Sequence, residues 1–273
     1  MKALETILSL LFLFTLNSGF SQPQKIWETK GFDTPESVYY HSDKDVLYVS
    51  NINGEPTNKD LNGYISKVST DGVIIEKKWI EGLHAPKGMV YAGGFLYVTD
   101  IDRIARIDIE EGKIVKFIPV EGATFLNDME SYLDVVYISE MNENKLYMLE
   151  GNEVSVFKEK GLANANGLYE ADGVLYSGNK NYVLQIDLES GEEGKTKAEV
   201  GGIDGLKEYD KETFLTSDWK GNIYKINRAG DTKLIFSTEG KKIQAADFEY
   251  IPDERKLIIP TFFHNTIAGY RLQ

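Results

Sequence analysis

Residues 161 to 192 read "GLANANGLYEADGVLYSGNKNYVLQIDLESGE". In this stretch a short apolar run follows Asn166, a turn at Asp172 and Gly173 follows that run, and two further apolar runs come after it. Short runs separated by Gly, Asn and Asp are typical of antiparallel β-strands joined by tight turns. The same pattern returns along the chain with a different polar residue in the place of Asn166. The chain is therefore expected to be a repeat protein.

Six stretches share this pattern, namely "DTPESVYYHSDKDVLYVSN", "HAPKGMVYAGGFLYVTD", "TFLNDMESYLDVVYISE", "NANGLYEADGVLYSGN", "GIDGLKEYDKETFLTSD" and "QAADFEYIPDERKLIIPT". Their matched positions are Glu36, Lys87, Asn127, Asn166, Asp204 and Asp247, at steps of 51, 40, 39, 38 and 43 residues. A third and a fourth run follow in most repeats, as in "IARIDIE" and "KIVKFIPV". A period of about 40 residues with four strands predicts an all-β, six-bladed β-propeller.

The two ends of the chain complement each other. The sixth repeat lacks a fourth strand because the chain stops at "YRLQ", whereas "KIWETKGF" precedes the first repeat and has no blade of its own. Pairing residues 26–28 with residues 267–271 would close the ring and remove an exposed strand edge. We therefore expect four-stranded blades throughout residues 22–273, with the last blade closed by the N-terminal strand.

The N-terminus has the pattern of an export signal. The apolar run "ILSLLFLFTL" follows Lys2, and the small residues Gly19 and Ser21 stand where a signal peptidase would read before Gln22. A run of about 10 residues is short against the roughly 20 that span a bilayer. The sequence predicts a signal peptide over residues 1–21, an exported protein, periplasmic or secreted, and no stable membrane insertion after cleavage.

Composition narrows the function classes. The formal net charge of −13 argues against a nucleic-acid partner, since phosphate contacts need clustered Lys and Arg. The chain has no cysteine, which excludes disulfides, thiol catalysis and thiolate metal sites. Neither a G-x-S-x-G elbow nor a P-loop is present.

The six matched positions predict a ring at one end of the propeller, because the innermost strand of every blade begins at the same face. Five of the six residues carry side-chain oxygen atoms, which suit a hard cation such as Ca²⁺, or Mg²⁺ or Mn²⁺. Each Asn or Asp taken alone is better explained as a turn residue before a strand, and it is the six positions in register that favour a ring. A metal-free ring in which Lys87 balances the carboxylates also remains open.

The segments "TPESVYY", "FLNDME", "ANANGLYEADGVLY" and "GIDGLKEY" resemble those of the senescence marker protein (regucalcin) and gluconolactonase family, six-bladed propellers with a metal in the central channel. The resemblance implies that Glu36, Asn166 and Asp204 are metal ligands and that Asn127 contacts water or substrate. The paraoxonase-like lactonases, similar central-calcium propellers, share this order of Glu, Asn, Asn and Asp. In the regucalcin family the residue that matches Asp204 is also proposed to deliver a proton.

What the resemblance implies is a metal-dependent hydrolase of lactones or related esters, in which one divalent cation, Ca²⁺ first among the candidates, polarises the carbonyl group of a small-molecule substrate. The expected catalytic residues are Asp204 and Asn127, and the expected substrate-binding residues are Asn127, Lys87, Asp247 and His264. Further polar candidates end the second strands, namely Asn51, Asp100, Glu140, Asn179, Asp218 with Trp219, and His264.

Two departures weaken the hydrolase hypothesis. A lysine, Lys87, faces the expected channel and would repel a metal or bind a substrate carboxylate, and Gly205 stands where some lactonases supply a ligand. The alternative is a non-catalytic exported propeller that binds a small molecule, a sugar or a protein and has a structural calcium site.

Overall fold

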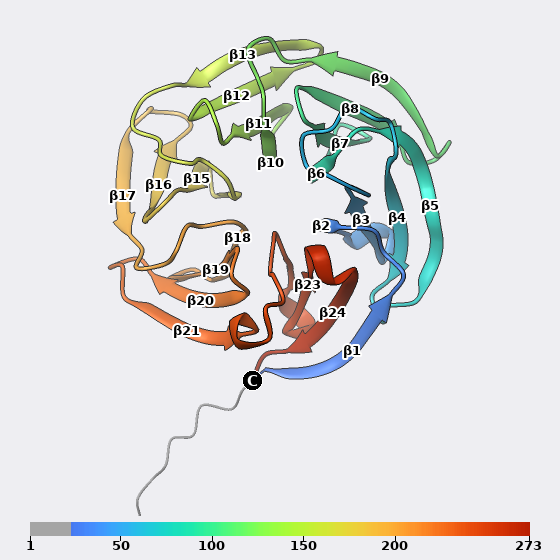
Figure 1. Cartoon of the computed structure of the whole chain (residues 1–273). Helices are drawn as coiled ribbons and strands as arrows, with labels where there is room; N and C mark the ends of the chain where they lie inside the picture. The colour runs from blue at the N-terminus through green and yellow to red at the C-terminus, as the bar shows by residue number, and fades with distance from the viewer. Residues whose placement is uncertain (1–22) are drawn as a thin grey trace, which may run out of the picture.

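The computed structural model describes residues 23–273, so the predicted signal peptide, residues 1–21, lies outside the described residues. Six antiparallel sheets of four strands surround a central axis, with the innermost strand of each sheet beside the axis and the outermost at the rim (Figure 1). The protein is a six-bladed β-propeller, and the predicted fold class is confirmed.

The blades follow one another along the chain. The first blade contains β2 (Pro35–His41), β3 (Val46–Asn51), β4 (Gly63–Ser69) and β5 (Ile74–Leu83). The second contains β6 (Pro86–Ala92), β7 (Phe95–Asp100), β8 (Arg103–Asp108) and β9 (Lys113–Pro119). The third contains β10 (Leu126–Tyr132), β11 (Val135–Glu140), β12 (Lys145–Glu150) and β13 (Glu153–Lys158).

The fourth blade contains β14 (Leu168–Ala171), β15 (Val174–Gly178), β16 (Tyr182–Asp187) and β17 (Glu193–Lys197). The fifth contains β18 (Leu206–Asp210), β19 (Thr213–Asp218), β20 (Asn222–Asn227) and β21 (Thr232–Ser237). The sixth contains β22 (Glu249–Ile251), β23 (Lys256–Pro260), β24 (Thr266–Arg271) and β1 (Gln24–Lys30). The short 3₁₀ helices are η1 (Ser42–Lys44), η2 (Glu239–Lys241), η3 (Pro252–Glu254) and η4 (Phe262–His264). Among residues 23–273 no helix has the length and apolar character needed to cross a membrane.

The last blade is built from both ends of the chain. Strand β1 pairs antiparallel with β24, so that Gln24 lies opposite Arg271 and Lys30 lies opposite Thr266. This is the pairing that the missing fourth strand of the sixth repeat predicts, and it leaves the sixth blade with the same four strands as the others.

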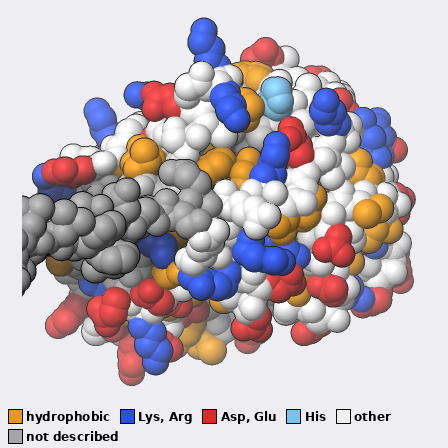
Figure 2. All heavy atoms as spheres, turned by 90° about the horizontal axis from the view of Figure 1, so that it is seen from below, with side chains coloured by type: hydrophobic (Ala, Val, Ile, Leu, Met, Phe, Trp, Pro, Cys, Tyr) orange, Lys and Arg blue, Asp and Glu red, His pale blue; other side chains and the backbone are white. Residues whose placement is uncertain are grey.

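The core lies between neighbouring blades. Each innermost strand, or the residue next to it, contributes an apolar side chain at the matching position that is at most 4 % exposed: Val38, Met89, Met129, Leu168, Leu206 and Phe248. Burial of each such side chain stabilises the fold by about 1.5–3 kcal/mol. On the face shown in Figure 2, acidic and basic side chains are interspersed. The residues two positions before these apolar side chains lie at the start of the innermost strands or just ahead of them, beside the axis.

Candidate functional site

A cavity of about 360 Å³ opens on the propeller axis, where the innermost strands begin. All six blades contribute to its lining, which consists of Glu36, Ile52, Pro56, Lys87, Phe125, Asn127, Met141, Asn164, Asn166, Gly201, Gly202, Ile203, Asp204, Trp219 and Phe262. Five of the six predicted ring positions are therefore brought together in one place, and we call Glu36, Lys87, Asn127, Asn166 and Asp204 the pocket ring. The volume is suited to a small molecule.

Local backbone geometry aims the pocket ring at the axis. In the first three blades the ladder between the first two strands is interrupted at the ring residue, as between Pro35 and Val38. In the first, third and fifth blades, the residue after the ring residue donates its backbone N–H to a serine hydroxyl on the second strand. These bonds run from Ser37 to Ser50 (2.9 Å), from Asp128 to Ser139 (2.9 Å) and from Gly205 to Ser217 (2.7 Å). Such interruptions re-aim side chains and recur near functional sites.

Glycine lets the innermost strands approach one another below the ring. A Cβ atom at Gly167 would lie 2.5 Å from the carbonyl oxygen of Asp204, and one at Gly205 would lie 2.6 Å from Oδ1 of Asp247. Any larger side chain would push these blades apart and separate the ring residues. Gly205, which departs from some lactonases in the sequence, is therefore required here by packing.

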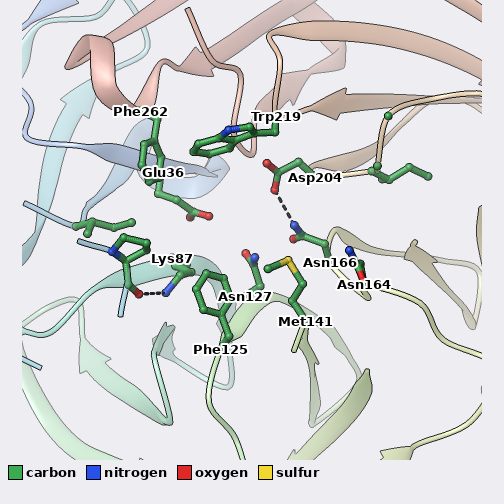
Figure 3. Close-up of a pocket in the computed structure, with 15 residues that line it drawn as sticks. Glu36, Lys87, Phe125, Asn127, Met141, Asn164, Asn166, Asp204, Trp219 and Phe262 are labelled. Carbon is green, nitrogen blue, oxygen red and sulfur yellow. Dashed lines mark hydrogen bonds between the residues drawn. The ribbon is translucent and has the colours of Figure 1, made fainter. Parts of the chain in front are cut away.

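Two carboxylates share the pocket. Burial raises the pKa of Glu36 well above its usual range, and the nearby charge of Asp204 raises it further. Burial and the carboxylate of Asp247 likewise raise the pKa of Asp204 to about 7. The Oε2 atom of Glu36 is buried and has no hydrogen-bond partner among residues 23–273. Figure 3 shows this carboxyl group extending into the middle of the pocket, on the side that faces Asp204 and Asn127.

The two amides complete an oxygen-rich surface. The Nδ2 atom of Asn166 donates to Oδ1 of Asp204 at 2.7 Å, which leaves the carbonyl oxygen of Asn166 free to face the pocket. Asn127 is 5 % exposed and lies between Glu36 and Asn166 in Figure 3. Each of these side chains presents oxygen without bringing another charge.

Lys87 is the cation of the pocket ring. It is 1 % exposed, its Nζ atom donates to the carbonyl oxygens of Pro56 and Ala85 at 3.2 Å each, and it lies 4.5 Å from the centre of the Phe125 ring. Burial lowers the pKa of Lys87 to about 8, although the charges of Glu36 and Asp100 oppose this change. Lys87 therefore lies in the same pocket as Glu36 and is held by backbone oxygens.

The donor set fits a hard divalent cation. Within the described part of the chain, no group of three or more His, Cys, Asp and Glu side chains converges as a metal site. A cation here would therefore need amide oxygens of Asn166 and Asn127 in addition to the carboxylates of Glu36 and Asp204. Carboxylate and amide oxygens are the ligands that Ca²⁺ takes in proteins, and the unpartnered Oε2 atom of Glu36 is the feature that a cation would satisfy.

The sixth predicted ring residue, Asp247, is not in the pocket lining, and its assignment to the ring is wrong by one position. In the other blades the ring residue stands two positions before the buried core residue, and the residue two before Phe248 is Ala246. Asp247 instead accepts hydrogen bonds from Ser37 Oγ (2.6 Å) and from its neighbour Phe248 N (2.7 Å). It links the sixth blade to the first.

His264 also lies apart from the central pocket. It lines a separate hollow of about 50 Å³ near β1 and β24, together with Lys25 and Glu28. Its position at the end of the second strand of its blade predicted a place near the axis, but η4 carries it outward.

The polar residues at the ends of the other second strands are buried and hold the backbone. Asp100 Oδ1 accepts from the N–H groups of His84 and Ala85, and Glu140 Oε1 accepts from those of Thr124 and Phe125. Asn51 and Asn179 each accept one N–H in the same way. These residues fix the segments that lead into the innermost strands, so they position the pocket ring without lining the pocket.

A second charged group lies further along the innermost strands, and of its acids only Asp247 was among the predicted residues. We call Asp128, Glu130, Asp247 and Glu249 the channel carboxylates; they follow the ring positions by one or three residues. Lys207 lies among them, and although burial opposes its charge, the four carboxylates raise the pKa of Lys207. The alternation of polar and apolar residues in "GLKEYD" reads as a strand with one face in water, which hides the place of Lys207 among these acids.

Comparison with known proteins supports the fold. The chain matches no protein-family model and no curated protein sequence. Among solved structures, the WD40 β-propeller domain of Doa1 is similar with a TM-score of 0.68 and 12 % identity, over 93 % of this chain and 98 % of that one. Virginiamycin B lyase from Staphylococcus aureus is similar with a TM-score of 0.64 and 14 % identity, over 90 % and 99 %.

A chain of the nidogen/laminin complex is similar with a TM-score of 0.62 and 16 % identity, over 84 % of this chain and 95 % of that one. These proteins include a lyase and WD40 domains, and at such identities the likeness shows a shared propeller fold alone. The resemblance to the regucalcin and gluconolactonase family stays a prediction.

Proposed function

We propose that the pocket ring holds one divalent cation, Ca²⁺ first among the candidates, and that the protein hydrolyses a lactone or related ester. The observation that carries the proposal is the buried, unpartnered Oε2 atom of Glu36, which shares a pocket with the carboxylate of Asp204. Glu36, Asn166 and Asp204 would hold the cation. When bound, the cation polarises the substrate carbonyl and offsets the negative charge that develops on its oxygen.

Asp204 is suited to proton transfer. Without a cation the pKa of Asp204 is about 7, and a bound cation would keep the group ionised, so that its carboxylate is ready to accept a proton. As a water oxygen bonds to the carbonyl carbon, the Asp204 carboxylate accepts the proton of that water. The bond from the carbonyl carbon to the alcohol oxygen then breaks, and the proton returns to the departing alkoxide.

Asn127 and Lys87 orient the substrate. The Asn127 amide offers both a donor and an acceptor to water or to the ester, and its place between Glu36 and Asn166 keeps it beside the carboxylates (Figure 3). Lys87 has its ammonium group fixed by Pro56 and Ala85, so it is available to a substrate carboxylate without moving.

Calorimetric titration tests the cation site. After chelation, Ca²⁺ is titrated into the wild type, Asp204→Ala and Asn127→Ala, with Asp134→Ala as a control in the exposed turn between β10 and β11. We expect Asp204→Ala to lose about 100-fold in affinity, since a charged ligand is removed, and Asn127→Ala to lose less than about tenfold. If Asp204→Ala binds Ca²⁺ like the wild type, the pocket ring is not the site.

Enzyme assays test the reaction. A panel of lactones and aryl esters is assayed with Ca²⁺, Mg²⁺, Mn²⁺ and Zn²⁺ after chelation. We expect turnover that depends on the added cation, is abolished in Asp204→Ala and is impaired in Asn127→Ala beyond its loss of affinity. The absence of turnover with every cation would contradict the hydrolase proposal.

A second candidate is a binding protein without turnover, in which the cation has a structural role. The observation that favours it is Lys87, because a lysine beside Glu36 already compensates part of the acidic charge that a catalytic cation would otherwise balance. Ligand binding without hydrolysis, in the presence of Ca²⁺, would support this candidate.

A further inference from the structure

Large apolar side chains cover two opposite sides of the central pocket. Trp219 and Phe262 lie together beyond the carboxylates, and Phe125 and Met141 lie on the other side (Figure 3). Ile52 adds to the side of Phe262, with which it shares a small buried cluster. The pocket therefore has charged groups at its floor and apolar side chains on two sides. We call Trp219 and Phe262, with the adjacent Phe263, the aromatic wall.

The aromatic wall remains open to water. Trp219 is 46 % exposed, and its ring centre lies 4.7 Å from that of Phe262 at 75° and 6.2 Å from that of Phe263 at 85°. Phe263 is 61 % exposed. An exposed tryptophan edged by two phenylalanines leaves apolar surface in water at the mouth of a pocket, which is the usual form of a binding anchor.

The loops hold this wall in place. Asp218, which precedes Trp219, accepts hydrogen bonds from the N–H groups of Lys220 (2.9 Å) and Asn222 (3.1 Å). Asn265, at the end of η4, accepts the N–H of Thr34 at 2.8 Å and so ties the loop to the first blade.

Phe262 itself has φ = 48°, a left-handed conformation that costs energy for a bulky residue. The surrounding hydrogen bonds impose this conformation and keep the aromatic wall ready to bind.

We infer that the substrate carries a flat apolar group, such as an aryl group, which packs against Trp219 while its ester lies over Glu36 and Asp204. This inference rests on the proposed function and names its substrate class. A polyhydroxylated ring would place several hydroxyl groups against Phe125, Met141 and Phe262, which offer no hydrogen bonds, and each unpaired group would cost about 1–3 kcal/mol. A sugar lactone is therefore disfavoured.

Binding of a ketone tests the inference without any turnover. The probe is 2-acetonaphthone, which has a flat apolar group and a carbonyl but no ester bond, and the ring polyol 1,5-anhydro-D-glucitol is compared with it by calorimetry. We expect the ketone to bind at least about tenfold more tightly than the polyol, and Trp219→Ala to weaken ketone binding by about tenfold. Tighter binding of the polyol, or unchanged ketone binding by Trp219→Ala, overturns the inference.

Two further variants and one assay distinguish a role of Trp219 in recognising the apolar group from a role in cation binding or in hydrolysis. Phe263→Ala should weaken ketone binding by a few-fold, whereas Phe117→Ala, which removes a 36 % exposed phenylalanine on β9, should leave it unchanged. Ca²⁺ affinity should stay within about twofold in Trp219→Ala, since Trp219 offers no oxygen ligand. Hydrolysis of 2-naphthyl acetate and ethyl acetate is then compared. Ketone binding that depends on Trp219 without hydrolysis of either ester upholds the recognition of the apolar group and removes the hydrolase proposal alone.

Discussion

The pocket ring and the channel carboxylates both place acids on the propeller axis, but the two groups differ in how many of their carboxylate oxygens accept hydrogen bonds. Both side-chain oxygens of Asp128 accept N–H groups, from Met129 at 2.8 Å and from Leu168 of the next blade at 2.6 Å. Glu249 does the same with Tyr250 at 2.8 Å and Tyr40 of the first blade at 3.0 Å. Glu36, in contrast, keeps an oxygen with no partner among residues 23–273.

This difference separates structural from functional acids. Three of the channel carboxylates, Asp128, Asp247 and Glu249, join neighbouring blades, and Lys207 supplies positive charge to all four. The acids of the pocket ring are only partly compensated, by Lys87 and by one hydrogen bond from Asn166 to Asp204. Burial alone does not mark a site, since both groups are buried. An acid whose oxygens remain available is the stronger indication of a ligand.

Removal of Lys207 should have the largest effect on stability. We expect Lys207→Met to lower the free energy of unfolding by about 3 kcal/mol at pH 8, because ionised channel carboxylates lose their counter-charge. At pH 5.5 the loss should be smaller, since burial raises the pKa of Glu130 to about 7 and the acid is then protonated. Urea unfolding measures both values, with the exposed Lys220→Met as control. An equal loss at both pH values would show that packing, not charge, explains the lysine.

Asp128→Asn should lower the free energy of unfolding by about 2 kcal/mol, because an amide nitrogen replaces one oxygen and faces an N–H group. Urea unfolding in the presence of EDTA measures the change. Hydrogen exchange at Leu168 should increase, which locates the damage between the third and fourth blades. Unchanged stability would mean that the channel carboxylates are not structural.

Glu36→Gln should act in the opposite direction. In EDTA we expect this variant to be more stable than the wild type by about 1 kcal/mol, since it removes a buried charge next to Asp204 and breaks no hydrogen bond that the structure shows. The same variant should bind Ca²⁺ much more weakly in a calorimetric titration. A loss of stability in EDTA would place Glu36 with the structural acids.

The pH dependence should be the smallest effect. A bound cation needs ionised Asp204, whose pKa of about 7 means that about half of the chelated protein is protonated at pH 7. Ca²⁺ affinity should therefore rise at least about fivefold from pH 6 to pH 7 and at least about twofold from pH 7 to pH 8, since Glu36, whose pKa is also raised, must lose its proton as well. The metal-free protein should lose stability as pH rises from 4 to 7, because the Asp204 carboxyl group loses its proton at lower pH in the unfolded chain than in the folded protein. Affinity that does not change with pH would remove Asp204 from the ligand set.

The sequence was sufficient for the fold because strands and turns repeat at a nearly constant period. The period also located five ring residues, since each stands at a fixed distance from a buried apolar side chain. It failed at Asp247 because "QAADFEY" offers two small residues before the aspartate and a longer step from the fifth blade. The residue pattern favours the acid Asp247 as the sixth ring residue, whereas packing places Ala246 at the ring position.

The grouping of the channel carboxylates around Lys207, and the contact that the candidate residue Trp219 makes with Phe262, were beyond a reading of single repeats. Lys207 looks like a solvent-facing residue because the sequence does not tell that the polar residues of several innermost strands lie close together around the axis. Trp219 and Phe262 are 43 positions apart in the chain and meet only through the turn after Asp218 and the strained η4. Their contact depends on loop geometry, which has no period.

The pairing of β1 with β24 also has a consequence for folding kinetics. Residues 31–265 lie between the two strands, so their contact closes a loop of nearly the whole domain. Contacts between such distant residues form slowly, and we expect ring closure to be the last and rate-limiting step. Until then β1 is an unpaired edge, and the charged side chains of Lys25, Glu28 and Lys30 oppose its pairing with other chains. The yield of folded protein should therefore depend on how long β1 stays unpaired before it pairs with β24 of the same chain.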